Sequence, residues 1–196
     1  MFYVDDCICS TCRGQMPYFP HTIMLNSLRV EGLYLYEGLL REALIQFKEY
    51  NDEALYPLFL YPHMESLRKR YRGYYLMPLP SSARALQKRG FKPVNLIFSL
   101  LQLPVIEGFY KKSDVDQKSR SFAQRQQISQ QIALRKDIEL KDRKILLVDD
   151  IVTSGATMQA GYRLIRDQAA VVKGLTLSYN RRFLPLWQRF LVEKVL

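Results

Sequence analysis

Apolar residues recur with two different spacings along this chain. From Glu37 to Tyr50 they fall at helical spacing, which predicts an amphipathic helix. A second helical region is expected from about Asp52 to Tyr71, with an interruption near Pro62. Residues 1–30 show no clear period. Further helices are predicted at 81–88, 93–102, 122–135 and 157–169, and strands at 31–36, 74–79, 105–109, 144–149 and 171–178.

The run from Lys144 to Asp149 is almost continuously apolar, which is typical of a strand buried on both faces of a parallel sheet. Strands and helices alternate over 74–178. This alternation predicts an α/β fold with a mostly parallel central sheet flanked by helices, preceded by a small irregular segment that carries the cysteines. The polar stretch at 110–121 lacks an apolar period and is predicted to be a mobile loop.

Composition narrows the class of protein. A chain of 196 residues with 48% apolar residues can bury one core, which excludes a wholly disordered protein. The longest apolar stretch, Val94 to Ile106, is too short for a membrane span. Three cysteines, an odd number within residues 7–12, favour a reduced compartment, so we expect a cytoplasmic protein. The net charge of +10 predicts a polyanionic partner.

The most informative segment joins the strand at 144–149 to the helix at 157–169. Asp149 and Asp150 stand at the carboxyl end of the strand, where ligands of open α/β sheets bind. Their oxygens suit ribose hydroxyls or, through water, Mg²⁺. The Thr-Ser-Gly turn that follows opens a helix, whose N–H groups suit a phosphate. The segment therefore offers acceptors for a sugar diol and donors for its phosphate.

This segment resembles the 5-phosphoribosyl-1-pyrophosphate (PRPP) signature of type I phosphoribosyltransferases. That pattern is four apolar residues, two acids, two apolar residues and Thr-Ser/Thr-Gly-x-Thr. The resemblance implies catalytic roles for Asp149 and Asp150, and PRPP binding by Asp149, Asp150, Ile151, Val152, Thr153, Ser154, Gly155, Ala156 and Thr157. The alternative is an ordinary strand–turn–helix corner with a capping side chain.

Further motifs resemble ComF-type proteins in one order over about residues 31–179. They are Tyr36-x-Gly38-x-Leu40-Arg41 leading to Phe47-Lys48-Glu-Tyr50, then Met77-Pro78-Leu79-Pro80-Ser81 followed by Lys88-Arg89-Gly90-Phe91, then Gln117 and Arg125. Lys92 replaces the asparagine that is usual in this family. The resemblance implies a phosphoribosyltransferase domain behind a Cys-rich zinc module. It also implies a link to competence, the uptake of transforming DNA, with a helicase-like partner.

The same resemblance implies where pyrophosphate and a closing loop would lie. Pyrophosphate would meet the loop after the strand at 74–79 and the helix beyond it, through Ser81, Ser82, Arg84, Lys88 and Arg89. For Lys88 and Arg89 a solvated helix end is an equal alternative. The mobile loop would contribute Lys118, Arg120 and Arg125, with Lys111 and Lys112 at its start. Ordinary surface charge is the simpler role for each of these loop cations.

Three hypotheses about function follow. The first is a PRPP-binding ComF-type protein linked to competence and uptake of transforming DNA. The second is an active phosphoribosyltransferase of nucleotide salvage or biosynthesis, in which Mg²⁺ and basic groups would stabilise the departing pyrophosphate. The third is a non-catalytic scaffold that binds DNA or a helicase. Whether the chain turns over PRPP, and its oligomeric state, stay open.

The cysteines depart from the family pattern. Cys7, Cys9 and Cys12 provide three thiols, whereas a tetrahedral zinc site needs four ligands and no cysteine follows Cys12. Three interpretations stay open: a degraded zinc knuckle, a Zn²⁺ site completed by His21, and unliganded thiols. The domains expected are a partial zinc-knuckle segment at 1–30, a phosphoribosyltransferase-like domain at 31–180 and a tail at 181–196.

One basic cluster has no place in these motifs. Residues 68–72 carry four positive charges, and Tyr71, Tyr74 and Tyr75 lie in or beside the cluster. Stacking combined with phosphate contact is how single-stranded DNA is held without sequence preference. A solvated helix end is the simpler interpretation and is favoured. The tail, rich in apolar residues, is predicted to form a short packed helix.

Overall fold

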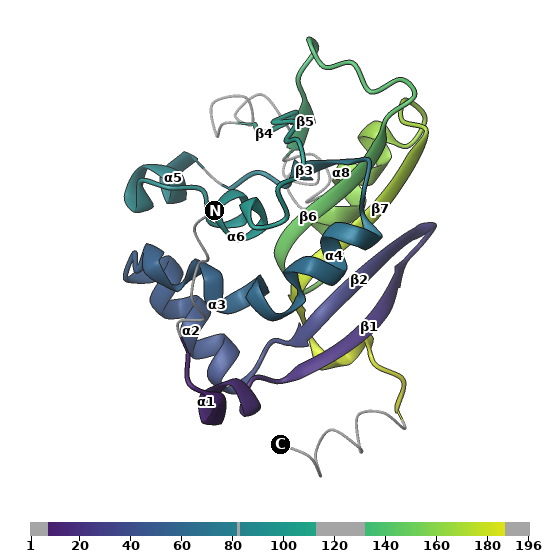
Figure 1. Cartoon of the computed structure of the whole chain (residues 1–196). Helices are drawn as coiled ribbons and strands as arrows, with labels where there is room; N and C mark the ends of the chain where they lie inside the picture. The colour runs from purple at the N-terminus through teal and green to yellow at the C-terminus, as the bar shows by residue number, and fades with distance from the viewer. Residues whose placement is uncertain (1–7, 82, 113–131, 187–196) are drawn as a thin grey trace, which may run out of the picture.

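The computed structural model describes residues 8–81, 83–112 and 132–186 (Figure 1). A five-stranded sheet with the order β1-β2-β7-β6-β3 forms its centre. The pairs β2–β7, β7–β6 and β6–β3 are parallel, and only β1 on the edge is antiparallel within this sheet. The predicted α/β fold with a mostly parallel sheet is thus confirmed. The strands are β1 (Tyr18–Leu25), β2 (Leu28–Leu35), β3 (Tyr74–Pro78), β6 (Lys144–Val152) and β7 (Val171–Tyr179).

Most predicted helices are present with shifted ends. The long region before β3 breaks into short segments at Pro57 and Pro62, each of which stands in the first turn of a new segment, where a missing N–H is tolerated. The helices are α1 (Ser10–Gly14), α2 (Gly38–Glu49), η1 (Glu53–Leu55), α3 (Tyr56–Leu60), η2 (Tyr61–His63), α4 (Met64–Arg70), α5 (Ala83–Arg89), α6 (Pro93–Ser99), α8 (Ala156–Ile165) and η5 (Arg181–Phe183).

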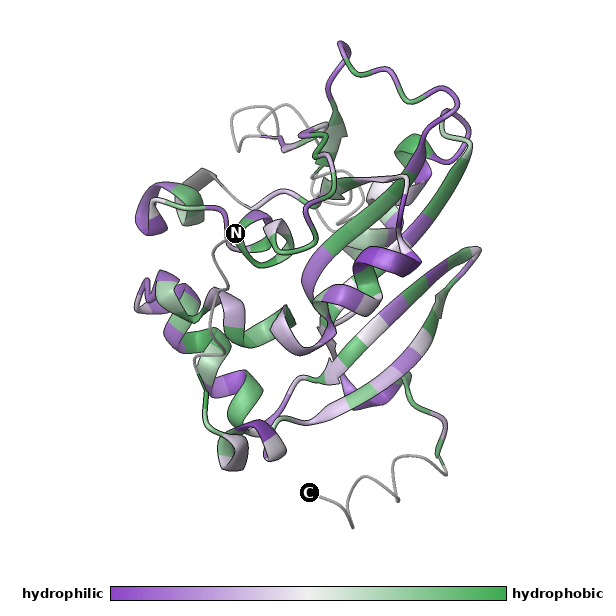
Figure 2. Ribbon diagram, in the orientation of Figure 1, coloured by the Kyte–Doolittle hydropathy of each residue, from purple (hydrophilic) through white to green (hydrophobic). Residues whose placement is uncertain are grey.

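The central strands of the sheet are buried on both faces, which explains the continuous apolar run of β6. Leu146 and Val148 point into a core shared with α2, α3, α4 and α6. Ile145 and Leu147 point to the opposite face, where α8 packs. Figure 2 shows β6 as a mostly hydrophobic strand inside the molecule and α4 as a largely hydrophilic helix. The carboxylates of β6 accordingly lie near its carboxyl end, beyond the apolar run.

The residues before β2 are more regular than the sequence pattern indicates. Tyr18–Leu25, which was expected to be irregular, forms β1 and pairs with β2, with an irregular register between Tyr18 and His21. Pro17 and Pro20 argued against a strand there. A proline is nevertheless tolerated on an edge strand. One side of such a strand has no neighbouring strand, so no hydrogen bond is lost where proline lacks an N–H.

Two predictions between β3 and β6 are wrong in part. Val105 makes only an isolated parallel bridge to Leu76, and the strand in this region is β4 (Phe109–Lys111). It pairs antiparallel with β5 (Ile132–Leu134). Residues 132–134, near the end of the helix predicted at 122–135, therefore form a strand. This pairing joins segments far apart in sequence and overrides the local four-residue spacing of Ile128 and Ile132. The predicted loop after residue 112 lies outside the described residues.

Candidate functional site

The carboxyl end of β6 brings the two predicted acidic residues to an edge of the sheet. Asp149 lies opposite Thr176 on β7, and Val148 lies opposite Pro78 on β3. The Leu79 N–H donates to the Val148 carbonyl at 3.0 Å, so the chain leaving β3 runs beside the acidic pair. The turn after Val152 leads directly into α8. The strand, the turn and the helix thus have the arrangement that the sequence predicted.

Gly155 makes the tight turn at the start of α8 possible. Its φ of 74° lies in the left-handed region, which side chains other than glycine's rarely adopt. A Cβ here would come within 2.6 Å of a methyl carbon of Leu25 on β1. The turn surrounds a small hollow of about 30 Å³, lined by Asp149 and by residues 151–158. The Ala156 N–H at its rim donates to the Ser154 hydroxyl at 3.3 Å.

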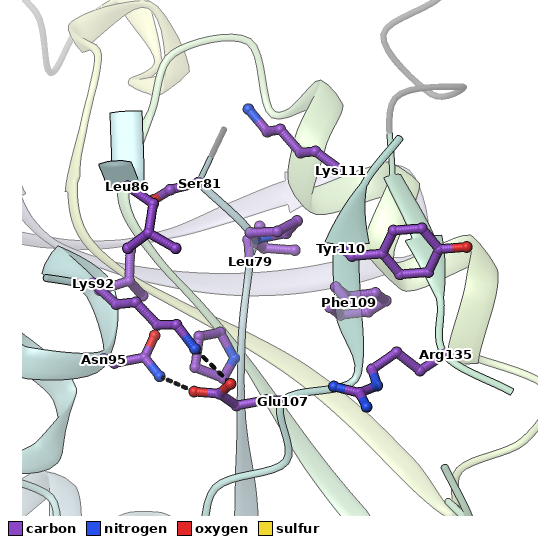
Figure 3. A pocket seen from close by; sticks show the side chains of 13 residues that line it. Leu79, Ser81, Leu86, Lys92, Asn95, Glu107, Phe109, Tyr110, Lys111 and Arg135 are labelled. Atoms are coloured by element: carbon purple, nitrogen blue, oxygen red, sulfur yellow. Dashed lines mark hydrogen bonds and ion pairs between the residues drawn. The ribbon is translucent and has the colours of Figure 1, made fainter. Parts of the chain in front are cut away.

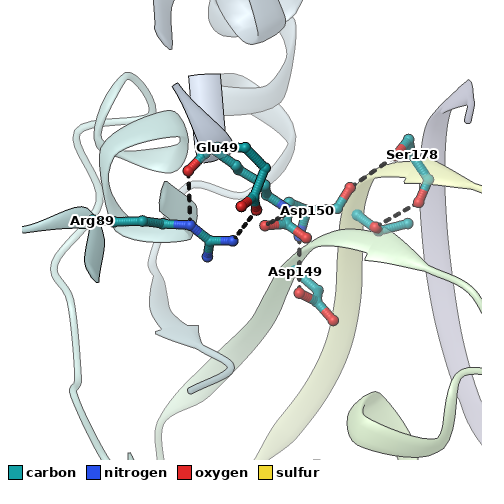
Figure 4. A network of polar contacts seen from close by, with 7 residues as sticks. Glu49, Arg89, Asp149, Asp150 and Ser178 are labelled. Atoms are coloured by element: carbon teal, nitrogen blue, oxygen red, sulfur yellow. Dashed lines mark hydrogen bonds and ion pairs between the residues drawn. The ribbon is translucent and has the colours of Figure 1, made fainter. Parts of the chain in front are cut away.

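The two carboxylates have different surroundings (Figure 4). Asp150 forms an ion pair with Lys48 of α2, with 2.6 Å between Nζ and Oδ2. The Asp150 carbonyl accepts a hydrogen bond from the Ser178 hydroxyl at 3.0 Å. Asp149 Oδ1 accepts from the Asp150 N–H at 2.9 Å, and its side chain lines the hollow. Asp150 is therefore held by a lysine, while Asp149 faces the turn.

Burial and the adjacent charge of Asp150 raise the pKa of Asp149 to about 8. The positive charges of Lys48 and Lys111 act in the opposite direction without cancelling that effect. A carboxyl group in this position is stabilised as an anion by any cation or hydrogen-bond donor that a ligand brings. Strongly perturbed carboxyl groups of this kind are typical of functional sites.

The residues predicted for pyrophosphate occupy two places. Ser81 lines a cavity at the end of β3. Lys88 and Arg89 instead contact the end of α2: Lys88 Nζ lies 3.2 Å from Glu49 Oε2, and Arg89 donates to Glu49 Oε1 at 2.6 Å and to the Lys48 carbonyl at 2.9 Å. Ser82 and the side chain of Arg84 lie outside the described part of the chain.

The cavity beside Ser81 is a feature that sequence reasoning missed (Figure 3). It has a volume of about 320 Å³ and lies between the end of β3, α6 and the β4–β5 pair. Glu107 in its wall accepts hydrogen bonds from Lys92 at 2.5 Å and Asn95 at 3.0 Å. Lys111 and Arg135 add two further cations to the lining. The lining of the cavity therefore combines apolar side chains, such as those of Leu79 and Phe109, with a net positive charge.

The other predicted site residues are only partly described. Cys7, Lys118, Arg120 and Arg125 lie outside the described residues. Cys9 precedes α1, and its sulfur accepts from the Cys12 N–H at 3.5 Å. His21 lies on β1 and lines a different cavity from these thiols. Within residues 8–81, 83–112 and 132–186, no three Cys, His, Asp or Glu side chains cluster as metal ligands.

The basic cluster at 68–72 is tied into the fold. Arg68 donates twice to the Leu100 carbonyl, Arg70 pairs with Glu31, and the Tyr71 hydroxyl donates to Glu31 at 2.8 Å. Tyr71 and Tyr74 are only 3% and 8% exposed, so neither ring is open for a base to stack on. The favoured interpretation of a solvated helix end fits Lys69, Arg70 and Arg72, which are exposed, but not Arg68 and Tyr71, which the fold holds.

Lys48 is the main residue whose role the sequence did not reveal. It stands in the Phe47-Lys48-Glu-Tyr50 motif that contributes to the ComF resemblance, and this was its only signal. Its position in the last turn of α2 does not say which strand end the helix faces. That information comes from the packing of α2 on the sheet.

Comparisons with known proteins identify the family of this chain. The model of the phosphoribosyl transferase domain family matches residues 85–182, which is half of the chain. The chain therefore belongs to the phosphoribosyl transferase domain family. Within it the ComF-type resemblance is confirmed: the chain is 25% identical over 174 residues to "Competence protein ComFC" of Bacillus subtilis, covering 87% of this chain and 71% of that protein.

A second relative carries the same name. "Competence protein ComFC" of Streptococcus pneumoniae is 21% identical over 187 residues, which covers 85% of this chain and 84% of that protein. Among solved structures, adenine phosphoribosyltransferase from Leishmania donovani is similar at 14% identity, with a TM-score of 0.39, over 84% of this chain and 89% of that one. In the part of the chain that the structure describes, no helix has the length and apolar character needed to cross a membrane.

Proposed function

We propose that this chain binds PRPP together with Mg²⁺ at the turn between β6 and α8, as a ComF-type phosphoribosyltransferase-like protein. The observation that carries the proposal is the juxtaposition at that turn. The half-buried carboxyl group of Asp149 faces a hollow walled by Thr153, Ser154 and the first turn of α8. This hollow lies at the carboxyl end of a parallel strand, inside the region that matches the family.

Each part of the ligand has a chemically suited part of the site. The N–H groups at the start of α8 and the hydroxyls of Thr153, Ser154 and Thr157 suit the 5-phosphate. Asp149 suits the ribose hydroxyls. Ser81 and Lys111, which line the cavity beyond β3, suit the pyrophosphate. Mg²⁺ fits oxygen donors of this kind, since it usually takes one or two carboxylates together with substrate phosphates.

We extend the proposal to the cell with less detail. The relatives that are named competence proteins favour a role in competence and in the uptake of transforming DNA. Single-stranded DNA and a competence helicase are the partners that such a role implies, and the cytoplasm is its location. Zn²⁺ binding by Cys7, Cys9 and Cys12 stays a prediction.

An active phosphoribosyltransferase of salvage or biosynthesis is the second candidate, and the perturbed carboxyl group favours it. In that case the C1–pyrophosphate bond would break as the acceptor nucleophile attacks C1. Asp149 would hold the ribose, and the cations around the cavity would stabilise the leaving pyrophosphate. A scaffold that keeps the fold without binding PRPP is the third candidate.

Titration calorimetry with PRPP, with and without Mg²⁺, separates these candidates. We expect Mg²⁺-dependent binding to the wild-type protein. Its loss should be at least about 100-fold in the Asp149→Asn/Asp150→Asn variant, because the carboxylate that faces the ligand and the carboxylate paired with Lys48 both lose their charge. Asp167→Asn is the matched control, since Asp167 is an exposed carboxylate distant in sequence from the turn. A folded wild-type protein that gives no heat would support the scaffold instead.

Pyrophosphate release distinguishes the two remaining candidates. An enzyme of salvage or biosynthesis should release pyrophosphate from PRPP when a purine or pyrimidine base is added. A binding protein should hold PRPP and release none. For DNA, a salt series of single-strand affinities is informative, because each phosphate contact steepens the dependence on salt.

A further inference from the structure

The end of α2 meets the acidic pair through one largely shielded lysine, Lys48. Lys48 and Asp150 form an ion pair in which the side chains are only 15% and 14% exposed. Other ion pairs in the described structure are more open, from Arg181–Glu37, whose side chains are 32% and 26% exposed, to Lys69–Glu65, whose side chains are 78% and 81% exposed. Two adjacent carboxylates at a buried strand end repel each other. A cation against one of them relieves that repulsion.

The lysine is itself held in place from the side of α5. Arg89 donates to the Lys48 carbonyl at 2.9 Å and to Glu49 at 2.6 Å, and only 16% of the Arg89 side chain is exposed. Arg89 thereby satisfies a carbonyl at the end of α2 that has no partner within the helix. Figure 4 shows Arg89, Glu49 and Asp150 in one continuous network.

The peptide of Asp150 is fixed from the other side by β7. Ser178 donates to the Asp150 carbonyl, and the Thr176 hydroxyl donates to the Ser178 carbonyl at 2.9 Å. Both β7 residues are fully buried. With the backbone held by β7 and the carboxylate held by Lys48, Asp150 has little freedom to turn toward a ligand. Among the described residues, no lysine or arginine forms an ion pair with Asp149, the neighbour that lines the hollow.

We propose that Lys48 is a positioning residue of the phosphoribosyl site: it holds the Asp150 carboxylate in an ion pair, and Asp149 is the carboxylate that meets the ligand. Arg89 keeps the end of α2 where Lys48 makes this contact. The inference rests on the proposed function. It assigns Arg89 to the support of the acidic pair, whereas the sequence predicted that Arg89 binds pyrophosphate.

A double-mutant cycle tests this role, with PRPP and Mg²⁺ as the ligand and calorimetry as the measurement. Lys48→Met should weaken PRPP binding about tenfold, because it leaves the Asp150 charge uncompensated beside Asp149. Once Asp150→Asn is present, adding Lys48→Met should change the affinity by less than about twofold. Lys48→Arg keeps the charge and should restore most of the affinity. Arg89→Met should weaken binding by a smaller factor, about threefold.

Lys69→Met is the matched control, because Lys69 is an exposed lysine of α4 in an open ion pair. It should bind PRPP as the wild type does. Circular dichroism and thermal melting show whether each variant is folded. If Lys48→Met does not fold, Lys48→Gln takes its place in the cycle, since it is a polar side chain that also removes the positive charge.

The outcomes separate this inference from the proposed function. A further tenfold loss when Lys48→Met is added to Asp150→Asn would mean that Lys48 contacts the ligand directly, and would overturn the positioning role. Wild-type affinity in Lys48→Met would overturn it as well. A wild-type protein that does not bind PRPP overturns the proposed function and this inference together.

Discussion

Two charged regions of the parallel sheet differ in how their charges are paired. Around the middle of β2 and the start of β7, Glu31 accepts from both Arg70 and Tyr71, and Lys173 lies 5.5 Å above the ring of Tyr74. Near the end of β6, two carboxylates stand side by side, and Lys48 of α2 pairs with one of them, Asp150. The first region pairs its charges with opposite charges and with rings, whereas the second leaves one carboxyl group, Asp149, facing a hollow.

This difference separates charges that stabilise the fold from charges that serve a ligand. A group with its partners in place contributes to stability and has little left to offer a ligand. A shielded carboxyl group with a raised pKa lowers the stability of the free protein. Such groups are typical of functional sites, where binding of a ligand compensates for that loss. The net charge of +10 therefore does not by itself mark the binding surface.

The largest expected effect comes from breaking the paired region around Glu31. Glu31→Leu removes the acceptor of the buried Tyr71 hydroxyl and the partner of Arg70. We expect the free energy of unfolding to fall by about 2 kcal/mol, since a buried donor is left unsatisfied. PRPP affinity should stay within about twofold of wild type, because Glu31 pairs with Arg70 and Tyr71 and not with Lys48 or the β6–α8 turn. Chemical denaturation and calorimetry measure the two quantities, and a parallel loss of both would contradict the comparison.

The second prediction concerns the end of β6, where removing the Asp149 charge should stabilise the protein. The folded state keeps a proton on Asp149 up to about pH 8, whereas the unfolded chain loses it near its ordinary pKa of 3.8. The unfolded state thus binds fewer protons between these values, and stability falls as the pH rises through this window. Asp149→Asn escapes that loss, so its free energy of unfolding should exceed wild type by about 1–2 kcal/mol at pH 8.

Urea denaturation at several pH values checks this sign. The advantage of Asp149→Asn should shrink toward pH 4, where Asp149 is protonated in both states. Asp167→Asn, at an exposed position, should show no such trend. A variant less stable than wild type at pH 8 would mean that the Asp149 carboxylate is already paired in the free protein.

The smallest expected effect is at the turn. Gly155→Ala puts a side chain on a residue with a φ of 74° and crowds Leu25. We expect a loss of about 1 kcal/mol in stability, as is usual for alanine in the left-handed region. PRPP affinity should fall more than stability alone explains, because the turn walls the hollow. Gly73→Ala is the control. Gly73 also has a positive φ, of 80°, but it lies just before the amino end of β3, and its Cβ would meet open space.

Much of the site could be predicted because it is local. The strand, the turn and the helix from 144 to 165 are consecutive, so one stretch of sequence specifies the acidic pair, the glycine and the helix N-terminus. The same holds for the sheet, whose buried central strands give continuous apolar runs. Periodicity and motif therefore agree in this part of the chain.

The parts that could not be predicted depend on packing between distant segments. Lys48 reaches Asp150 across about 100 residues of sequence, and Arg89 turns to α2 because Glu49 and the Lys48 carbonyl attract it. The β4–β5 pair and the edge strand β1 likewise depend on long-range partners. No periodicity within a short window records such contacts.

A crystal structure of the protein with PRPP and Mg²⁺ tests the central claim most directly. The account predicts the 5-phosphate against the N–H groups at the start of α8, with a ribose hydroxyl in hydrogen-bond contact with Asp149. It also predicts that Lys48 stays on Asp150. A second cavity of the molecule is lined by Arg29, Arg70 and Lys173. PRPP bound in that cavity, with the β6–α8 turn empty, would contradict the account.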